Sequence, residues 1–269
     1  MDHTDIAKRM KGYEAVTRNY LITRMPAIIR IDGKSFHTFT RGFIKPFDAV
    51  TMQSMQQTMK YLCENIQGCV LGYTQSDEIS LVLIDYKKLN SSAWFDYGIQ
   101  KCVSIAASMA TLAFQKAFAQ AVAEYEEAGA EKNNMETEGE FLKQCETYHK
   151  ALEKGAMFDA RIFNLPKEEV ANNIFWRQLD ATKNSIAMVA QANFSHKQLQ
   201  NKSGRQMKEM LSEQKGICWD DYAVSYKLGS CCIHKEGTGV NDRSKWIIDQ
   251  NIPVFKDEGR DYIEQLIYI

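Results

Sequence analysis

The sequence lacks most of the features that mark a specialised class of protein. Only four of its 269 residues are proline, and 33 lysines and arginines nearly balance 34 aspartates and glutamates, leaving a net charge of −1. A charge this small excludes a strongly basic or acidic protein, so any nucleic-acid site must be a local patch. Because no proline-rich linker and no internal repeat divides the chain, we expect a single domain over residues 1–269.

The cysteines and the apolar residues exclude further classes. None of the seven cysteines belongs to a CxxC pair, which predicts reduced thiols in the cytoplasm rather than a disulfide framework or a zinc site. The N-terminal sequence MDHTDIAKRM is charged from its second residue and is not typical of a signal peptide. We find no run of about 18 apolar residues that would span a membrane, so we expect no membrane partner.

What is present is an alternation of helical and β-rich segments. Helical spacing of apolar residues is found over 5–21, 48–66 and about 92–127, and Asp48 is the expected N-cap of the second helix. Strands are predicted by four β-rich runs, which lie at 27–31, 69–74, 79–84 and 158–165. Because a short connection separates the second and third runs, they predict a hairpin.

The order strand, helix, strand, strand predicts an α+β fold in which helices pack on an antiparallel sheet. The core is expected at about 5–120 and 156–194, and the second part ends in a long helix. Residues 124–155 are dense in Glu, Lys, Asn and Gly, which predicts a solvated, acidic helical insertion. Residues 197–237 are expected to form a basic helix and then a hairpin over 222–237.

Acidic residues stand at the ends of two predicted strands. Asp32 directly follows the strand AIIRI, and Asp77 and Glu78 lie at the hairpin tip in YTQSDEISLV. If the strands are neighbours, Asp32 and Asp77 meet, and carboxylates that close repel each other unless a divalent cation lies between them. Magnesium suits such oxygen ligands, and the Gly33 carbonyl could be a further one. The alternative is that Asp32-Gly33 and Ser76-Asp77 are only turn residues, and the pattern leaves both interpretations open.

Three blocks of the sequence resemble the tRNA-histidine guanylyltransferase superfamily of 3′–5′ polymerases. They are IIRIDGKSFHTF (28–39), KPFD (45–48) and YTQSDEISLV (73–82), and FDAR (158–161) and WRQLD (176–180) extend the resemblance over most of residues 5–235. The resemblance implies a palm-like antiparallel sheet, related to the polymerase palm and to GGDEF-type cyclase cores. It also implies two Mg²⁺ ions as cofactors, ATP and GTP or another NTP as substrates, tRNA as the partner and a homotetramer.

The resemblance further implies roles for individual residues. Catalysis is implied for Asp32, Lys45, Ser76, Asp77 and Glu78, and the metal would be held by Asp32, Asp77 and the Gly33 carbonyl. Nucleotide binding is expected at residues of the first block and of the long helix, namely Arg30, Gly33, Lys34, Ser35, Phe36, His37 and Lys101. An ion pair is the alternative for Arg30, and structural packing is the alternative for His37.

Contacts with tRNA or phosphate are expected at two further places. One is Trp176-Arg177, where anchoring of a helix is the alternative. The other is the basic run with Lys202, Arg205 and Lys208, for which a solvated helix face is the alternative.

One segment departs from the family pattern. Where eukaryotic guanylyltransferases carry HINN, this sequence has Thr182-Lys183-Asn184-Ser185, without the histidine. The departure favours a template-dependent 3′–5′ nucleotidyltransferase that repairs tRNA 5′ ends through an adenylylated or triphosphorylated end. The alternatives are a tRNA(His) guanylyltransferase that adds G at position −1, a palm-fold NTP cyclase-like enzyme and an inactive RNA-binding scaffold.

Overall fold

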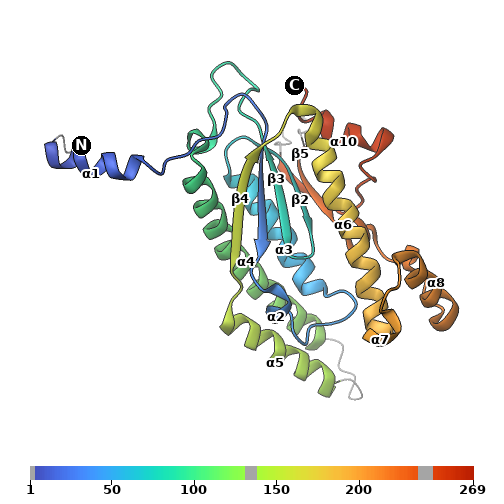
Figure 1. The fold of residues 1–269 in the computed structure, drawn as a ribbon. Coiled ribbons are helices and arrows are strands. Elements are labelled where there is room, and N and C mark those ends of the chain that lie inside the picture. Colours follow the sequence, from blue (N-terminus) through green and yellow to red (C-terminus); the bar gives the residue numbers. More distant parts are fainter. Residues whose placement is uncertain (1–3, 131–137, 236–244) are drawn as a thin grey trace, which may run out of the picture.

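The computed structural model describes residues 4–130, 138–235 and 245–269. Within them a six-stranded antiparallel sheet has the order β4-β1-β3-β2-β5-β6 (Figure 1). The strands are β1 (Ala27–Gly33), β2 (Cys69–Gln75), β3 (Glu78–Leu83), β4 (Phe158–Asn164), β5 (Ser230–Lys235) and β6 (Lys245–Asp249). The predicted α+β fold is confirmed, and β1 lies directly beside the β2–β3 hairpin.

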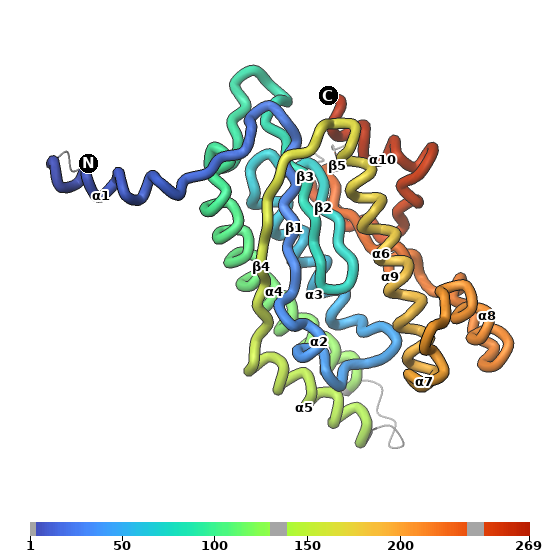
Figure 2. The backbone as a smooth tube through the Cα atoms, viewed as in Figure 1, coloured from blue at the N-terminus to red at the C-terminus, as the bar shows by residue number. Residues whose placement is uncertain are grey.

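Helices cover both faces of this sheet (Figure 2). α3 (Ala49–Asn65) and α4 (Ile99–Ala130) pack on one face, and α6 (Lys167–Asn193) packs on the other beside the C-terminal segment. The other α-helices of the described residues are α1 (Asp5–Ala15), α2 (Phe36–Phe39), α5 (Glu138–Lys154), α7 (His196–Leu199), α8 (Gly204–Lys215), α9 (Val224–Leu228) and α10 (Asp261–Glu264).

The two-sided cover explains the nearly continuous apolar runs of the central strands. Successive residues of a strand point to opposite faces, so a strand between two helical layers needs apolar residues at most positions. Ile29 and Ile31 of β1 pack in the cluster under α3 and α4, whereas Ile28 packs in the cluster under α6. All six residues of β3 are buried, including Glu78 at its start.

Helix α4 corrects one prediction. Its residues Ile99–Gly129 are long and apolar enough to cross a membrane by length and composition, although the sequence analysis found no such run. One helix of this kind is weak evidence, because the core helix of a globular protein passes the same test. In the structure α4 places Cys102, Ala106, Ala110 and Phe114 in the core against the sheet.

The segment that was expected to be a solvated insertion is partly core. α5 buries Cys145, Tyr148 and Ala151, and the Tyr148 ring meets Phe43 edge-on at 5.0 Å between ring centroids. The charged side chains that predicted solvation occupy the other side of this amphipathic helix. Residues 131–137 of the predicted insertion lie outside the described residues.

The hairpin predicted over 222–237 is wrong. Val224–Leu228 forms α9, and β5 pairs with β2 and β6 instead. Gly229 joins the two elements at a φ of 87°, and a Cβ at Gly229 would lie 2.5 Å from the Thr74 carbonyl oxygen. Only glycine fits this abrupt change from helix to strand. Residues 236 and 237 lie outside the described residues.

Helix α1 is shorter than the helix predicted over 5–21. Ala7 N donates to Thr4 Oγ1 at 3.3 Å at its start, and none of its residues is buried. Figure 1 shows α1 projecting away from the rest of the chain. The residues that follow α1 run to β1, and Tyr20 forms an isolated β-bridge with Gly98.

Candidate active site

The end of β1 and the β2–β3 hairpin bring three acidic residues to one end of the sheet. Asp32 lies opposite Glu78 in the β1–β3 register, and Gly33 N donates to the Asp77 carbonyl oxygen at 3.1 Å. Ser76 and Asp77 form the two-residue connection, and Ser76 has a φ of 51°. Positive φ at the first central position is usual in tight hairpins. Asp32 therefore lies on the strand next to the hairpin that carries Asp77, as the strand order predicted, and its charge acts on the Asp77 carboxyl.

Asp77 carries the electrostatic signature of a functional group. Burial away from water raises the pKa of its carboxyl, and the charges of Asp32 and Glu78 raise it further. Ser76 Oγ donates to Asp77 Oδ1 at 3.0 Å, which opposes the rise in pKa without cancelling it. A carboxylate held at such a site, beside another carboxylate, is favourably neutralised by a bound cation.

Gly33 lets the chain turn tightly beside these carboxylates. A Cβ at Gly33 would lie 2.5 Å from the Phe36 ring and 3.1 Å from the Asp77 Cβ. The Phe36 ring is buried against Phe39 and Phe114, at centroid distances of 5.1 and 5.6 Å, so it has no room to retreat. Glycine at position 33 is therefore a packing requirement of the site.

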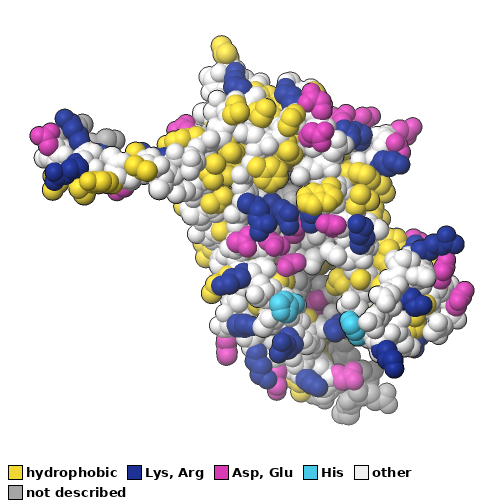
Figure 3. All heavy atoms as spheres, viewed as in Figure 1, with side chains coloured by type: hydrophobic (Ala, Val, Ile, Leu, Met, Phe, Trp, Pro, Cys, Tyr) yellow, Lys and Arg dark blue, Asp and Glu magenta, His cyan; other side chains and the backbone are white. Residues whose placement is uncertain are grey.

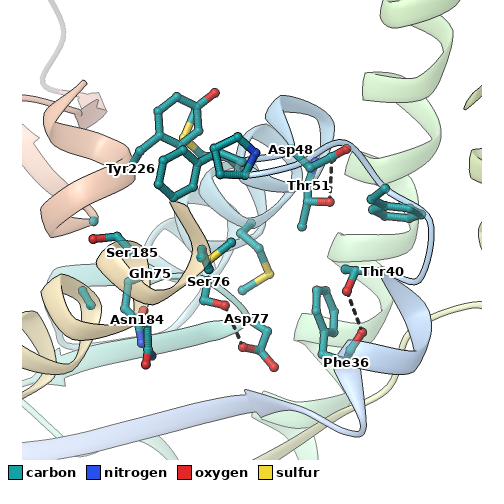
Figure 4. Close-up of a pocket in the computed structure, with 18 of the residues that line it drawn as sticks. Phe36, Thr40, Asp48, Thr51, Gln75, Ser76, Asp77, Asn184, Ser185 and Tyr226 are labelled. Atoms are coloured by element: carbon teal, nitrogen blue, oxygen red, sulfur yellow. Dashed lines mark hydrogen bonds between the residues drawn. The ribbon is translucent and has the colours of Figure 1, made fainter. Parts of the chain in front are cut away.

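A cavity of about 500 Å³ opens beside the hairpin (Figure 4). Figure 4 shows Ser76 and Asp77 between α6 on one side and the Phe36–Thr51 part of the chain on the other. The space-filling view shows this face of the molecule hollowed beside α6, with basic side chains on both rims (Figure 3). The predicted site residues that line the cavity are Gly33, Ser35, Phe36, His37, Lys45, Ser76 and Asp77.

Glu78 is occupied by ion pairs and does not line the cavity. Its Oε1 accepts from Arg177 Nε at 2.6 Å, and its Oε2 accepts from Arg177 Nη2 at 2.9 Å. Arg30 Nε lies 3.1 Å from the same Oε2, without the alignment of a hydrogen bond. Both carboxylate oxygens have arginine partners, which favours a structural role for Glu78, and its catalytic role stays a prediction. The ion-pair alternative for Arg30 is the one that the structure contains.

Asp32 and Asp77 offer magnesium two carboxylate ligands but not a complete set of protein ligands. In the described ranges, no group of three or more His, Cys, Asp or Glu side chains is arranged to hold a metal. Magnesium, however, usually takes one or two protein carboxylates and completes its shell with water and substrate phosphates. Asp32 and Asp77 could supply those two carboxylates, because Glu78 is the acid that the arginines neutralise.

Comparison with known proteins identifies the family. The sequence profile described as tRNAHis guanylyltransferase matches residues 7–166, which is more than half of the chain. The chain belongs to the tRNA-histidine guanylyltransferase family. Members of this family are nucleotidyltransferases that act on tRNA 5′ ends.

Similar proteins align over nearly the whole chain. A bacterial tRNA(His) guanylyltransferase-like protein in complex with ATP is 40% identical with a TM-score of 0.80, over 98% of this chain and 99% of that one. A structure of such a bacterial protein in complex with GTP is 39% identical with a TM-score of 0.76, over 99% and 100%. An uncharacterised protein of Acanthamoeba polyphaga mimivirus is 26% identical over 93% of this chain and 84% of its own length.

One wall of the cavity in this guanylyltransferase-family chain is aromatic, and the sequence analysis did not predict it. Phe47 stacks on Tyr226 with ring centroids 4.7 Å apart and planes 14° apart, and Tyr222 meets Phe47 edge-on at 5.3 Å. Interpreting 222–237 as a hairpin hid the helical turn of α9 that brings Tyr226 to the cavity. Rings stacked in this way could contact a nucleobase.

Helix α6 forms a second wall that the sequence analysis did not assign. Its residues Asn184, Ser185, Met188 and Gln191 line the cavity. Asn184 and Ser185 belong to the segment that replaces the HINN of eukaryotic guanylyltransferases. That departure was the available signal, because a segment that differs at a shared position is a candidate contact with substrate.

Lys101 and Lys34 do not line the cavity. Lys101 lies in the first turns of α4, near the start of β1, and its Nζ is 4.4 Å from the Phe95 ring centroid. Phe114, which packs on Phe36, is thirteen residues further along α4, or about 20 Å by helical rise. Lys101 therefore lies away from the cavity, and its contact with a nucleotide stays a prediction. The Lys34 side chain is exposed, and its backbone N–H donates to the Met157 carbonyl oxygen at 2.8 Å.

The predicted tRNA contacts divide into one buried residue and several exposed ones. Arg177 is only 6% exposed and bound to Glu78 and Asp180, which favours the alternative that it anchors a helix. Trp176 is 50% exposed, with the Arg177 guanidinium 4.4 Å from its ring centroid, and its contact with tRNA stays a prediction.

The basic run on α8 is exposed and partly paired. Arg205 Nε lies 2.9 Å from Glu209 Oε1, and Lys208 Nζ lies 2.8 Å from Asp220 Oδ2. Exposed pairs of this kind are weak and exchange readily for other partners. Contact of Lys202, Arg205 and Lys208 with tRNA therefore stays a prediction.

The loop that carries Lys45 is held in place by Asp48. Thr51 N donates to Asp48 Oδ1 at 2.7 Å, which confirms Asp48 as the N-cap of α3. Ile44 N donates to Asp48 Oδ2 at 3.2 Å, and the buried Tyr148 hydroxyl donates to the same oxygen at 2.6 Å. α5 thus supports a wall of the cavity from behind.

We expect Tyr148→Phe to lower the free energy of unfolding by about 1–2 kcal/mol, because Asp48 loses a buried donor. Urea denaturation followed by circular dichroism measures this change. Leu142→Ala is the control, since Leu142 is 54% exposed on the same helix and its truncation should change stability little. Equal stability of Tyr148→Phe and the wild type would mean that the Asp48–Tyr148 contact is not formed in solution.

Proposed function

We propose that this chain is a magnesium-dependent 3′–5′ nucleotidyltransferase that repairs tRNA 5′ ends by copying the opposite acceptor strand. The observation that carries the proposal is the pairing of β1 with the hairpin, which brings the charge of Asp32 to Asp77. Asp77 lines a cavity of about 500 Å³, and Asp32 lies on the neighbouring strand outside the lining. Similar bacterial proteins bind ATP and GTP, which supports nucleotides as the occupants of this cavity. The homotetramer and the cytoplasmic location stay predictions.

The proposed reaction has two transfers at phosphorus. The 5′-monophosphate of the tRNA attacks the α-phosphorus of ATP, and pyrophosphate leaves, so that the end is adenylylated. The 3′-hydroxyl of an incoming NTP then attacks the 5′-phosphorus, and AMP leaves. An end that already carries a triphosphate would lose pyrophosphate in the same second step.

The residues of this chain would act mainly by positioning and by charge. Asp32 and Asp77 would hold magnesium, which neutralises phosphate charge when it is bound. Lys45 and His37 line the same cavity and could contact phosphate oxygens, and the Ser76 hydroxyl holds the Asp77 carboxylate. The Phe47–Tyr226 stack would offer a flat apolar face to a base.

The missing histidine supports choice of the nucleotide by the template. Thr182-Lys183-Asn184-Ser185 stands where eukaryotic guanylyltransferases have HINN, and Asn184 and Ser185 line the cavity. If base pairing with the acceptor strand selects the nucleotide, the protein does not need to recognise guanine.

The test uses 5′-labelled tRNA that lacks its first nucleotide, incubated with the protein, ATP, Mg²⁺ and each NTP in turn. We expect extension only by the NTP that is complementary to the opposite acceptor base. A matched tRNA with that acceptor base changed should switch the preferred NTP. Addition of G to both tRNAs would instead identify a G−1 guanylyltransferase. Consumption of NTP without tRNA would favour the cyclase-like alternative.

A further inference from the structure

A cluster of four charged side chains joins α6 to the β2–β3 hairpin. Arg177 from the middle of α6 binds Glu78 through two parallel hydrogen bonds of 2.6 and 2.9 Å. Its third nitrogen, Nη1, lies 2.8 Å from Asp180 Oδ2, and Arg30 of β1 adds its Nε at 3.1 Å from Glu78. Two positive and two negative charges balance, and the side chains of Glu78 and Arg177 are 6% and 7% exposed.

The position of this cluster is its most informative property. A buried ion pair stabilises a fold little, because the cost of removing both charges from water offsets their attraction. Two-pronged pairing of a guanidinium with a carboxylate does fix direction, since both planar groups must align. The pair therefore specifies where α6 lies against β3 more than how stable the fold is.

Helical periodicity connects the cluster to the cavity. The positions four, seven, eight and eleven residues after Arg177 lie on the same side of an α-helix. These positions are Ala181, Asn184, Ser185 and Met188, and all four line the cavity. From Arg177 to Asn184 the helix rises about 10 Å, or two turns. A shift of α6 at Arg177 would thus move the whole wall.

The other end of the pair leads directly to the carboxylates. Glu78 follows Asp77 in the chain and lies opposite Asp32 in the sheet. Asp77 lines the cavity, whereas Glu78 is turned to Arg177 and is absent from the lining. One contact therefore links the acidic edge of the cavity to its α6 wall.

We propose that Glu78 and Arg177 form a positioning clamp that sets the distance between the α6 wall and the Asp32–Asp77 pair, and so the fit of the nucleotide. Glu78 in this view is neither a magnesium ligand nor a general acid. The inference rests on the proposed function for the identity of the bound molecule. The clamp itself concerns only residues of this chain.

The test compares Glu78→Gln, Arg177→Met and the double variant Glu78→Gln/Arg177→Met. The double variant removes the two most buried charges together, and the charges left without these partners, on Arg30 and Asp180, have side chains that are 23% and 32% exposed. It should therefore fold even if a single variant does not. We expect every variant to weaken GTP binding about tenfold, and the double variant to be no worse than Arg177→Met, because both lose the same contact. Arg177→Lys keeps the positive charge but cannot make the two parallel hydrogen bonds of the guanidinium, so it should bind GTP as weakly as Arg177→Met.

Two further measurements separate a clamp from a catalytic or merely structural group. The Mg²⁺ concentration for half-maximal activity should stay within about twofold of the wild type in Glu78→Gln, since the clamp holds no metal. Hydrogen exchange at the backbone of residues 178–188 should be faster in every variant, with or without nucleotide. The control is Glu64→Gln, which removes an exposed 3.9 Å pair with Lys60 on α3 and should change none of these readouts.

The outcomes distinguish failure of the clamp from failure of the proposed function. If the double variant binds GTP as the wild type does, or if its defects are the sum of the two single defects, the clamp is refuted. A higher Mg²⁺ requirement in Glu78→Gln would make Glu78 a metal ligand. If the wild type neither binds GTP nor extends tRNA, the proposed function fails. Exchange at 178–188 then still decides whether Glu78 and Arg177 fix α6.

Discussion

Replacing Asp77 by asparagine should abolish nucleotide addition while the fold remains intact. Asp77 lines the cavity, its carboxyl is acted on by the charge of Asp32 and, unlike Glu78, it has no ion pair within the described residues. Asparagine has nearly the same shape and keeps one oxygen, but it lacks the charge that attracts magnesium. We expect the rate to fall by about 10³-fold or more, because loss of a metal contact removes several kcal/mol of transition-state stabilisation.

The measurement is single-turnover extension of 5′-labelled tRNA at saturating ATP and NTP. The far-ultraviolet circular dichroism spectrum should match that of the wild type. Asp261→Asn is the control, because Asp261 is exposed at the start of α10 and outside the cavity lining. Activity of Asp77→Asn within about tenfold of the wild type would remove Asp77 from the proposed metal site.

The same substitution should raise the stability of the protein in the absence of divalent cations. Burial, and then the charges of Asp32 and Glu78, raise the pKa of the Asp77 carboxyl above that of an ordinary aspartate. Between the ordinary pKa and this raised pKa, the folded chain binds more protons than the unfolded chain. Stability therefore falls as the pH rises through that window, and above it the cost of the buried charge is fully present.

Asparagine carries no such cost, so Asp77→Asn should melt at a higher temperature than the wild type at pH 7 in EDTA. Each kcal/mol gained corresponds to roughly 2–4 °C in a chain of this size. The difference should shrink as the pH is lowered towards the ordinary aspartate pKa. Addition of Mg²⁺ should raise the melting temperature of the wild type more than that of the variant. A variant less stable than the wild type at pH 7 would contradict this account.

Loss of activity with a gain in stability would mark Asp77 as a residue kept for function. A structural aspartate shows the opposite pattern, in which removal of the charge breaks an ion pair or a cap and lowers stability. Asp48 illustrates this contrast, since it accepts hydrogen bonds from Thr51, Ile44 and Tyr148. The two aspartates line the same cavity, and we expect their removal to change stability in opposite directions.

Much of the fold could be predicted because its signals are local. The apolar runs of β1 and β3, the cap at Asp48 and the short connection at Ser76-Asp77 each depend on residues a few positions apart. Predicting that Asp32 and Asp77 meet required one more step, the pairing of β1 with the hairpin. The family motifs pointed to the same region, since seven of the residues they implied line the cavity, Asp77 among them, although Asp32 does not.

The failed predictions concern residues whose environment is set by distant parts of the chain. Arg177 looked available for tRNA, but it is buried against Glu78, which is 99 residues earlier in the sequence. Tyr148 lies in a segment with a solvated composition and packs with Phe43 and Asp48, about 100 residues earlier. No pattern within either segment contains its partner.

The sequence by itself determined the family, the elements and the acidic pair, because periodicity, caps and motifs are properties of short stretches. Only the tertiary structure decided which acid remains free for a metal, since Asp77 and Glu78 are adjacent and chemically alike. Burial against Arg177 and Arg30 neutralises Glu78, whereas Asp77 lines the cavity and its carboxyl is acted on by the charge of Asp32. The deciding interaction is an ion pair between side chains from distant segments, and such a pair exists only after α6 has packed on the sheet.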